Sequence, residues 1–258
     1  MKKILIGALL LTGCALPVMA CTGISATAKD GGYVQARTIE WGDSYLPSQY
    51  VVIPCGHEMI SYTPKGMNGA KFRARYGVVG LSIVLKDFVV EGLNEAGLSA
   101  GLFYFPHYGN YPVYDAKQNT RTVADLQLVA WMLSQFSTIE EIKAAMQDIR
   151  VVSVDTTGAS STVHWRIGDA NGRQVVLEFV DGVPCFYENE IGVLTNSPGF
   201  PWQMTNLNNY VNLYPGGAEA HQLGGVTIFP FGAGSGFQGI PGDVTPPSRF
   251  VRAAFYKA

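Results

Sequence analysis

Short runs of alternating apolar and polar residues dominate the first two thirds of the chain. Thr22 to Ala28, the turn Gly31-Gly32 and Tyr33 to Trp41 predict a β-hairpin, because strands repeat every two residues and paired glycines favour tight turns. The hairpin puts Arg37 one partner away from Cys21. Further strands are expected over residues 50–53, 78–85, 97–105, 162–168 and 173–180.

Two helices are expected to interrupt the strands. The first should begin near Thr122, with Asp125 three residues on and apolar positions at helical spacing behind it. The second should begin after Thr138, where Glu141 completes a capping box. Strands before and after a helical pair predict an α+β fold with layered sheets and helices. Because no linker or internal repeat divides the chain, we expect one domain over residues 21–258.

The composition narrows the classes of partner. Of the 258 residues, 47% are hydrophobic and 15% are charged, and the formal net charge is -2. The chain therefore has no basic footprint for nucleic acid. We expect its partners to be small molecules or further copies of itself.

Residues 1–20 have the features of a secretory signal peptide. Lys2 and Lys3 precede an apolar run too short to span a bilayer, and Val18-Met19-Ala20 resembles a cleavage site. This predicts a periplasmic or secreted protein with no stable membrane insertion after cleavage. Cleavage after Ala20 would make Cys21 the first residue of the mature chain.

A cysteine at a free N-terminus can act as its own catalyst. A free α-amino group has a reference pKa of about 7.7 to 8.0 and a free thiol about 8.5, so moving a proton between them costs on the order of 1 kcal/mol. The amine of Cys21 could then serve as general base for its own thiol.

Two other interpretations of the N-terminus stay open. Cys21 could be a structural thiol. The stretch Leu11-Thr12-Gly13-Cys14 resembles a lipobox, in which Cys14 is acylated and becomes the N-terminus of a membrane-anchored lipoprotein. Cys21 would then lack a free amine, which favours a non-catalytic small-molecule binding protein of the same fold.

Other motifs give little support to a cofactor or metal. The stretch 234–239 has dinucleotide-binding spacing, but no helical pattern follows it. The four histidines are far apart, and the cysteines form no metal-binding pair. We therefore expect neither a metal nor an organic cofactor. Whether Cys55 and Cys185 form a disulfide or remain two buried thiols is open.

Several motifs together resemble one known family. They are Cys21-Thr22-Gly23, Ala36 to Trp41, Gly92 to Leu98, Leu194 to Pro198, Asn206 to Tyr210, Pro241-Gly242-Asp243 and Ser248 to Phe255. In order and spacing they are similar to the choloylglycine hydrolase and penicillin V acylase family. The resemblance covers essentially all of residues 21–258.

The resemblance implies an N-terminal-nucleophile hydrolase with an αββα sandwich that cleaves linear amides and forms a homotetramer. Cys21 would be the nucleophile, and Arg37 would favour its thiolate and disfavour a protonated amine. Asn196 would donate to the oxyanion, and Arg249 would support the same charged site. Arg252 has no family counterpart and is interpreted as structural.

The chain departs from the family pattern at two places. Glu40 stands where aspartate commonly holds the α-amino group, and Asp43 could take part instead. Relatives continue for several tens of residues beyond the Ser-Arg-Phe motif, whereas this sequence stops at Ala258. We therefore expect C-terminal elements of the fold to be lacking and one sheet to be short of strands.

The substrate class follows from the resemblance only in outline. Tyr104 stands where bile-salt-cleaving relatives have asparagine and penicillin-cleaving relatives have tyrosine. A pocket drawn from Trp41, Tyr104 and Phe105 would bind the acyl group, although these aromatic residues could equally belong to the core. The expected substrate is a conjugated bile salt or a penicillin V-like N-acyl compound. Residue patterns do not separate these from acyl-homoserine lactones.

Overall fold

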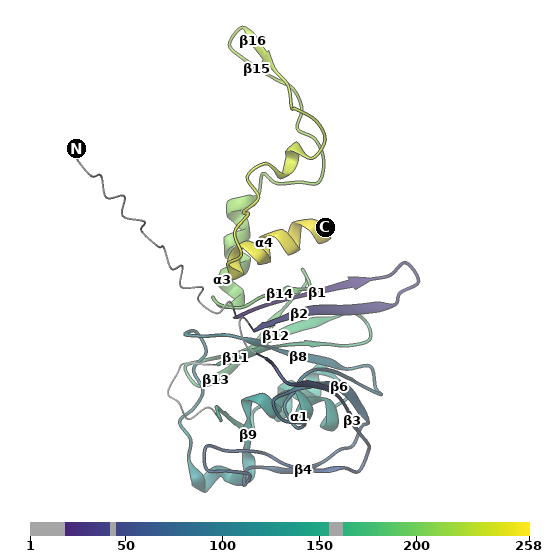
Figure 1. The fold of residues 1–258 in the computed structure, drawn as a ribbon, viewed down its shortest axis with the longest axis vertical. Helices are drawn as coiled ribbons and strands as arrows, with labels where there is room; N and C mark the ends of the chain where they lie inside the picture. Colours follow the sequence, from purple (N-terminus) through teal and green to yellow (C-terminus); the bar gives the residue numbers. More distant parts are fainter. Residues whose placement is uncertain (1–18, 42–44, 155–161) are drawn as a thin grey trace, which may run out of the picture.

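The structure is a computed structural model that describes residues 19–41, 45–154 and 162–258. Two β-sheets lie face to face at its centre, with helices on both outer sides (Figure 1). The smaller sheet has the strand order β14-β1-β2, and the larger has the order β13-β12-β11-β8-β7-β6-β3. The α+β class expected from the sequence is confirmed.

The predicted hairpin forms the smaller sheet together with a short third strand. All nine residues of β1 pair antiparallel with β2, and Cys21 is opposite Ile39 while Gly23 is opposite Arg37. The strand β14 pairs with the other edge of β1 at Gly23 and Ile24. The strands are β1 (Met19–Thr27), β2 (Tyr33–Trp41) and β14 (Val193–Leu194).

The larger sheet is an antiparallel array in which every predicted strand is found, together with two that were not predicted. Its strands are β3 (Ser48–Ile53), β6 (Val78–Ile83), β7 (Val89–Asn94), β8 (Ser99–Tyr104), β11 (Val163–Gly168), β12 (Gln174–Val180) and β13 (Val183–Glu188). Every residue of β11 is buried, because the sheet is covered on both faces at its centre. The two strands that the sequence analysis did not predict are β7 and β13.

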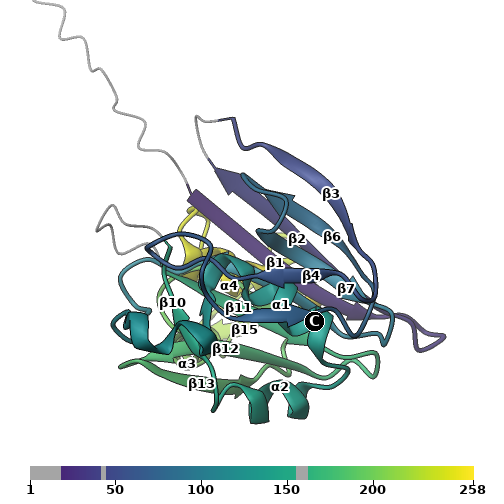
Figure 2. The same cartoon turned by 90° about the horizontal axis from the view of Figure 1, so that it is seen from below.

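Helices cover the outer side of each sheet, which gives four layers in the order αββα (Figures 1 and 2). On the larger sheet, α1 packs against β7 and β8, and α2 follows it; on the smaller sheet, α4 packs against β1 and β14, and α3 packs against α4. The helices are α1 (Leu128–Gln135), α2 (Ile139–Ala145), α3 (Phe200–Asn206) and α4 (Pro246–Lys257). Among the described residues, none of these helices could cross a membrane, given their length and polarity.

One helix boundary was predicted wrongly. Residues 122–124 are extended and pair in parallel with residues 150–152, as strands β9 (Thr122–Ala124) and β10 (Arg150–Val152). A single 3₁₀ turn follows, so α1 begins at Leu128. Backbone pairing to a distant segment outweighs the local helical pattern here. The second helix begins as predicted, with Thr138 and Glu141 forming a complete capping box.

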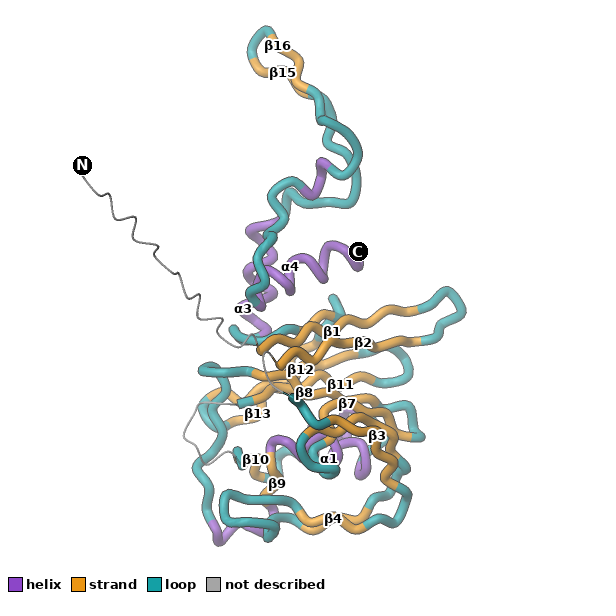
Figure 3. Tube along the Cα trace, viewed as in Figure 1, coloured by secondary structure: helices purple, strands orange, loops and turns teal. Residues whose placement is uncertain are grey.

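Two small hairpins lie outside the two main sheets. One pairs β4 (Glu58–Ile60) with β5 (Lys71–Arg73). The other pairs β15 (His221–Leu223) with β16 (Val226–Ile228) at the tip of a long arm that stands away from the layers (Figure 3).

The two sheets come unusually close at Gly23. A Cβ atom at this position would lie 2.6 Å from Cζ of Phe103 and 3.0 Å from Nη1 of Arg166. Both of these side chains are fully buried in the larger sheet. Only glycine therefore lets β1 lie flat on β8, two residues from Cys21.

We expect Gly23→Ala to lower the free energy of unfolding by about 1–3 kcal/mol, because a methyl group overpacks this contact. Urea denaturation measures the effect. The matched control is Gly225→Ala in the arm, where the added Cβ would meet no atom within 4 Å. Equal unfolding free energies for Gly23→Ala and wild type would contradict the prediction, because they would show that the two sheets accommodate the methyl group without loss of stability.

Candidate active site

Cys21 lies in β1 on the face that packs against the larger sheet. It is 6% exposed and belongs to the same apolar cluster as Phe103 and Phe250. The chain runs through Cys21 into Ala20, so the nitrogen of Cys21 is a peptide N–H in this structure. This N–H donates to Oδ1 of Asn196 at 2.8 Å.

Asn196 reaches Cys21 because of the register of β14 against β1. Leu194 is opposite Gly23, so two further residues along the antiparallel strand bring Asn196 level with Cys21. The side-chain Nδ2 of Asn196 donates to the carbonyl oxygen of Tyr104 at 2.7 Å. The amide group is thereby fixed between the beginning of β1 and the end of β8, and it is 2% exposed.

Arg249, from the first turns of α4, joins the same cluster. Its Nη1 donates to the carbonyl oxygen of Cys21 at 2.5 Å and to Oγ1 of Thr22 at 2.6 Å, and its Nη2 donates to Oδ1 of Asn196 at 2.8 Å. Burial lowers the pKa of Arg249, while the charge of Glu40 acts in the opposite direction. Arginine nevertheless stays charged in proteins, so a cation lies beside Cys21.

Arg37 lies on the same face of the sheet as Cys21, two pairs along the hairpin rather than the one pair expected from the sequence. Its guanidinium group donates to the carbonyl oxygens of Leu102 and Val90. It also lies 4.0 Å from the centre of the Phe103 ring and 3.6 Å from a carboxylate oxygen of Glu91. Its Nε donates to the carbonyl oxygen of Thr38 within β2, while the rest of the guanidinium group contacts the larger sheet, so its charge faces the interior near Cys21.

Two further charged residues at this interface were not found by sequence reasoning. Arg166 of β11 is fully buried; it donates to Glu91 Oε1 at 2.9 Å and to the carbonyl oxygen of Ile24 at 3.2 Å. Glu91 therefore pairs with both Arg166 and Arg37. The signal was an arginine within the otherwise apolar strand 163–168, since a buried charge requires partners.

Glu40 is exposed and pairs with Ala20 in the hairpin, and the nitrogen of Cys21 has Asn196 as its partner in the unprocessed chain. The role of Glu40 toward a free amine stays a prediction. The side chain of Trp41, together with Asp43 and Cys14, lies outside the described residues.

The aromatic residues proposed for substrate binding separate in the structure. Phe105 is 2% exposed and stacks on the ring of His164, with centroids 4.3 Å apart. This burial supports the alternative that Phe105 is a core residue. Tyr104 is half-buried, and its carbonyl oxygen binds Asn196.

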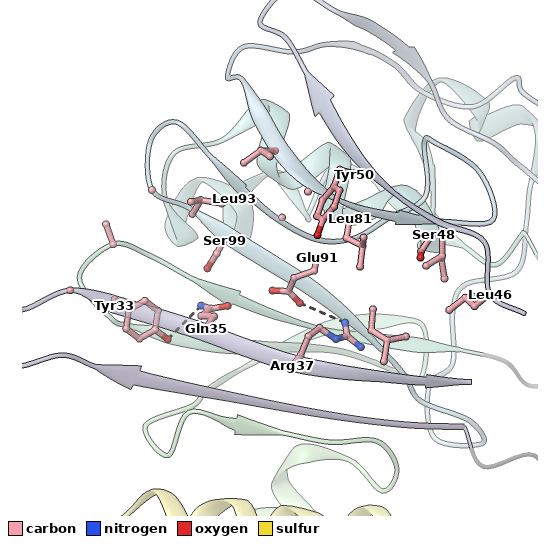
Figure 4. Close-up of a pocket in the computed structure, with 18 of the residues that line it drawn as sticks. Tyr33, Gln35, Arg37, Leu46, Ser48, Tyr50, Leu81, Glu91, Leu93 and Ser99 are labelled. Atoms are coloured by element: carbon pink, nitrogen blue, oxygen red, sulfur yellow. Dashed lines mark hydrogen bonds and ion pairs between the residues drawn. The ribbon is translucent and has the colours of Figure 1, made fainter. Parts of the chain in front are cut away.

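A cavity of about 970 Å³ lies between β2 and the larger sheet, beside Arg37 (Figure 4). Residues from β2 form one wall and residues from β3, β6 and β7 form the other, including Tyr33, Gln35, Ile39, Tyr50, Leu81 and Leu93. Ile39 is the pairing partner of Cys21, so the cavity adjoins the site. Tyr104 and Phe105 do not line it.

The other two described cysteines form no disulfide. Cys55 and Cys185 are both free thiols, and neither is fully buried, because Cys55 is exposed and Cys185 is half-buried. The stretch 234–239 contains a single 3₁₀ turn over 235–237. No cluster of metal-binding side chains occurs in the described ranges of the chain.

Comparison with known proteins agrees with this geometry. Residues 21–258 match the family model of linear amide C–N hydrolases, choloylglycine hydrolase family. A bile salt hydrolase/transferase of Clostridium perfringens is 32% identical over 241 residues, which cover 92% of this chain and 71% of that protein.

Solved structures give the same picture. A variant of the conjugated bile acid hydrolase from Clostridium perfringens superposes with a TM-score of 0.79 at 30% identity, covering 92% of this chain and 71% of that one. Penicillin V acylase from Agrobacterium tumefaciens gives a TM-score of 0.70 at 26% identity, covering 92% and 65%.

The fold is thus the αββα sandwich of the N-terminal-nucleophile hydrolases, and the class of protein is a hydrolase of linear amide C–N bonds. Within that class, the chain belongs to the choloylglycine hydrolase family.

We expect Arg249→Lys to loosen the beginning of β1, because a single ammonium group cannot replace a fork that contacts Cys21, Thr22 and Asn196. The unfolding free energy should fall by about 1–3 kcal/mol. Amide hydrogen exchange at residues 21–24 should become faster.

The control for this prediction is Arg252→Lys in the same helix. Arg252 donates to the carbonyl oxygens of Pro241 and Asp243, neither of which belongs to β1. It should leave exchange at residues 21–24 unchanged. Equal effects of the two substitutions on that segment would contradict the assignment of Arg249 to the site.

Proposed function

We propose that the chain is an exported amidase whose nucleophile is Cys21, freed as the N-terminal residue by cleavage after Ala20. The observation that carries this proposal is the cluster around Cys21. Its nitrogen and the cation of Arg249 both lie 2.8 Å from one oxygen of Asn196, in a buried site next to Arg37. After cleavage, such a cluster would hold the new amine and the thiol of Cys21 beside the side-chain amide of Asn196.

The reaction would proceed in two stages. The α-amine takes the thiol proton, and Sγ of Cys21 forms a bond to the amide carbonyl carbon, whose oxygen becomes negative. Nδ2 of Asn196 has two hydrogens, of which one is used by Tyr104, so the other can donate to this oxyanion. The C–N bond then breaks as the amine protonates the leaving nitrogen. Water hydrolyses the acyl-enzyme by the same proton path.

The substrate class is proposed as a conjugated bile salt or a penicillin V-like N-acyl compound. The similarity to a bile salt hydrolase/transferase at 32% identity supports the first, and the likeness to penicillin V acylase structures supports the second. The volume of the cavity beside Arg37 and Ile39 lies within the range of about 300–1,000 Å³ found for small-molecule sites.

We further propose that the protein works as a homo-oligomer, a tetramer by family resemblance. The arm that carries β15 and β16 exposes Leu223, Val226, Phe229 and Phe231 far from the layers (Figure 1). Exposed apolar residues gathered on one projecting segment are typical of a protein–protein contact. Light scattering of the purified protein measures the assembly.

We expect wild-type protein beginning at Cys21 to release glycine or taurine from conjugated bile salts, or phenoxyacetate from penicillin V. Cys21→Ser should reduce the rate at least about 100-fold, because a serine hydroxyl is a much weaker nucleophile near neutral pH. Rapid acid quenching and intact-mass measurement should find the acyl group on wild type only. Full activity in Cys21→Ser would refute the mechanism.

The mature N-terminus separates this proposal from the lipoprotein alternative. Intact mass and N-terminal sequencing of the exported protein should give Cys21 as the first residue. A diacylglycerol-modified Cys14 followed by intact residues 15–20 would support an anchored binding protein without this chemistry.

A further inference from the structure

Two buried ionisable residues, which the proposed reaction does not use, contact the turn that contains Asn196. His164 of β11 is 0% exposed and Glu178 of β12 is 2% exposed. Nδ1 of His164 lies 3.0 Å from Oε1 of Glu178, and Nε2 of His164 lies 3.0 Å from the carbonyl oxygen of Thr195. One end of this pair thus reaches the residue directly before Asn196.

The other end reaches the far side of the same turn. Oε1 of Glu178 also accepts a hydrogen bond from the backbone N–H of Phe200 at 2.8 Å. The turn is in close contact here, because a Cβ on Gly199 would lie 3.0 Å from Oε2 of Glu178. The pair therefore fixes residues 195 and 200, which lie on either side of Asn196, to the neighbouring strands β11 and β12 of the larger sheet.

The ring of His164 also packs against the residues on either side of Tyr104, which is a hydrogen-bond partner of Asn196. It stacks on Phe105 with an angle of 6° between the ring planes. Its centroid lies 6.2 Å from that of Phe103, and these two rings are nearly perpendicular. Tyr104, between these two residues, supplies the carbonyl oxygen that accepts from Nδ2 of Asn196. His164 therefore contacts the backbone directly before Asn196 and the two residues that flank Tyr104.

The contacts define where the protons are. A carbonyl oxygen can only accept, so Nε2 of His164 carries a hydrogen toward Thr195. The N–H of Phe200 can only donate, so Oε1 of Glu178 accepts from it. One more proton then lies between Nδ1 and Oε1. Without that proton, two lone pairs would face each other at 3.0 Å in a buried site.

We infer that His164 and Glu178 are positioning residues that hold Asn196 in place to bind the oxyanion. The inference rests on the proposed function and deepens it. Replacing Glu178 by glutamine is a sharp test, because one atom meets both His164 and Phe200. If the glutamine places its oxygen at the position of Oε1, His164 must be a buried imidazolium without a counter-ion to keep both of its contacts. If it places its nitrogen at that position, two donors face each other, the amide group and the N–H of Phe200.

We expect Glu178→Gln to lower kcat by about 10- to 100-fold with KM changed less than about threefold, because a misplaced donor weakens binding of the transition state more than binding of substrate. His164→Phe should have the same effect, since it keeps a ring against Phe105 and removes both nitrogen contacts. Steady-state kinetics on the bile salt or penicillin V substrate measures both, and either variant suffices if the other does not fold.

The matched control is Ser61→Ala. Ser61 is also fully buried and loses comparable contacts, to Gln127 and to the N–H of Ala124, but these are far from the turn. It should lower stability and leave kcat unchanged. An equal fall in kcat in Ser61→Ala would show that loss of stability alone explains the kinetics, and would overturn the inference.

A double-substitution cycle tests whether the pair acts through Asn196. On an Asn196→Ala background, Glu178→Gln should change kcat by less than about twofold, because the donor that it positions is already absent. Multiplicative losses would overturn the inference.

Hydrogen exchange keeps this test independent of the proposed function. Exchange at the amide of Phe200 should become at least about tenfold faster in Glu178→Gln and stay unchanged in Ser61→Ala. If wild type hydrolyses no amide, the proposed function fails, and exchange still reports on the pair. Unchanged exchange at Phe200 in Glu178→Gln would overturn the positioning role.

Discussion

The position of Cys21 depends on one side-chain amide. Oδ1 of Asn196 accepts from the nitrogen of Cys21 and from Arg249, while Nδ2 donates to the carbonyl oxygen of Tyr104. These three partners come from β1, α4 and the end of β8, so a single group sets three of the four layers relative to each other. An aspartate would place an oxygen against the carbonyl of Tyr104, and a glutamine would be one methylene too long.

Burying this site requires that several arginine charges be compensated. An unpaired charge in a protein interior is costly, and the chain compensates mainly with backbone carbonyl oxygens. Arg37 donates to Val90 and Leu102, Arg166 to Ile24, and Arg249 to Cys21. Glu91 adds a carboxylate shared by Arg37 and Arg166. The buried arginine side chains therefore cross-link the strands whose carbonyl oxygens compensate their charge.

Much of this arrangement could be predicted from local patterns. The hairpin carries strong alternation and a Gly-Gly turn, so its two strands and the place of Arg37 near Cys21 were predictable, although the register differs by one pair from the one expected. The capping box at Thr138 was equally local. The predicted start of the first helix near Thr122 was wrong because residues 122–124 pair with residues 150–152, a contact that local periodicity does not encode. Whether Phe105 lines a pocket or belongs to the core stayed open from the sequence, because its stacking on His164 is a tertiary property. Arg166, Glu178 and His164 lie in apolar strands, where charge was the only signal.

The arrangement around Asn196 also favours the use of an α-amine as base. If Cys21 is the N-terminal residue, its amine takes the place of an N–H that shares an acceptor with Arg249, both at 2.8 Å. A protonated amine would then place a second positive charge within about 6 Å of the guanidinium, where each repels the other. A neutral amine keeps the hydrogen bond to Asn196 without that repulsion. In the proposed mechanism, the cation of Arg249 would therefore also favour the protonation state in which the amine can accept the thiol proton.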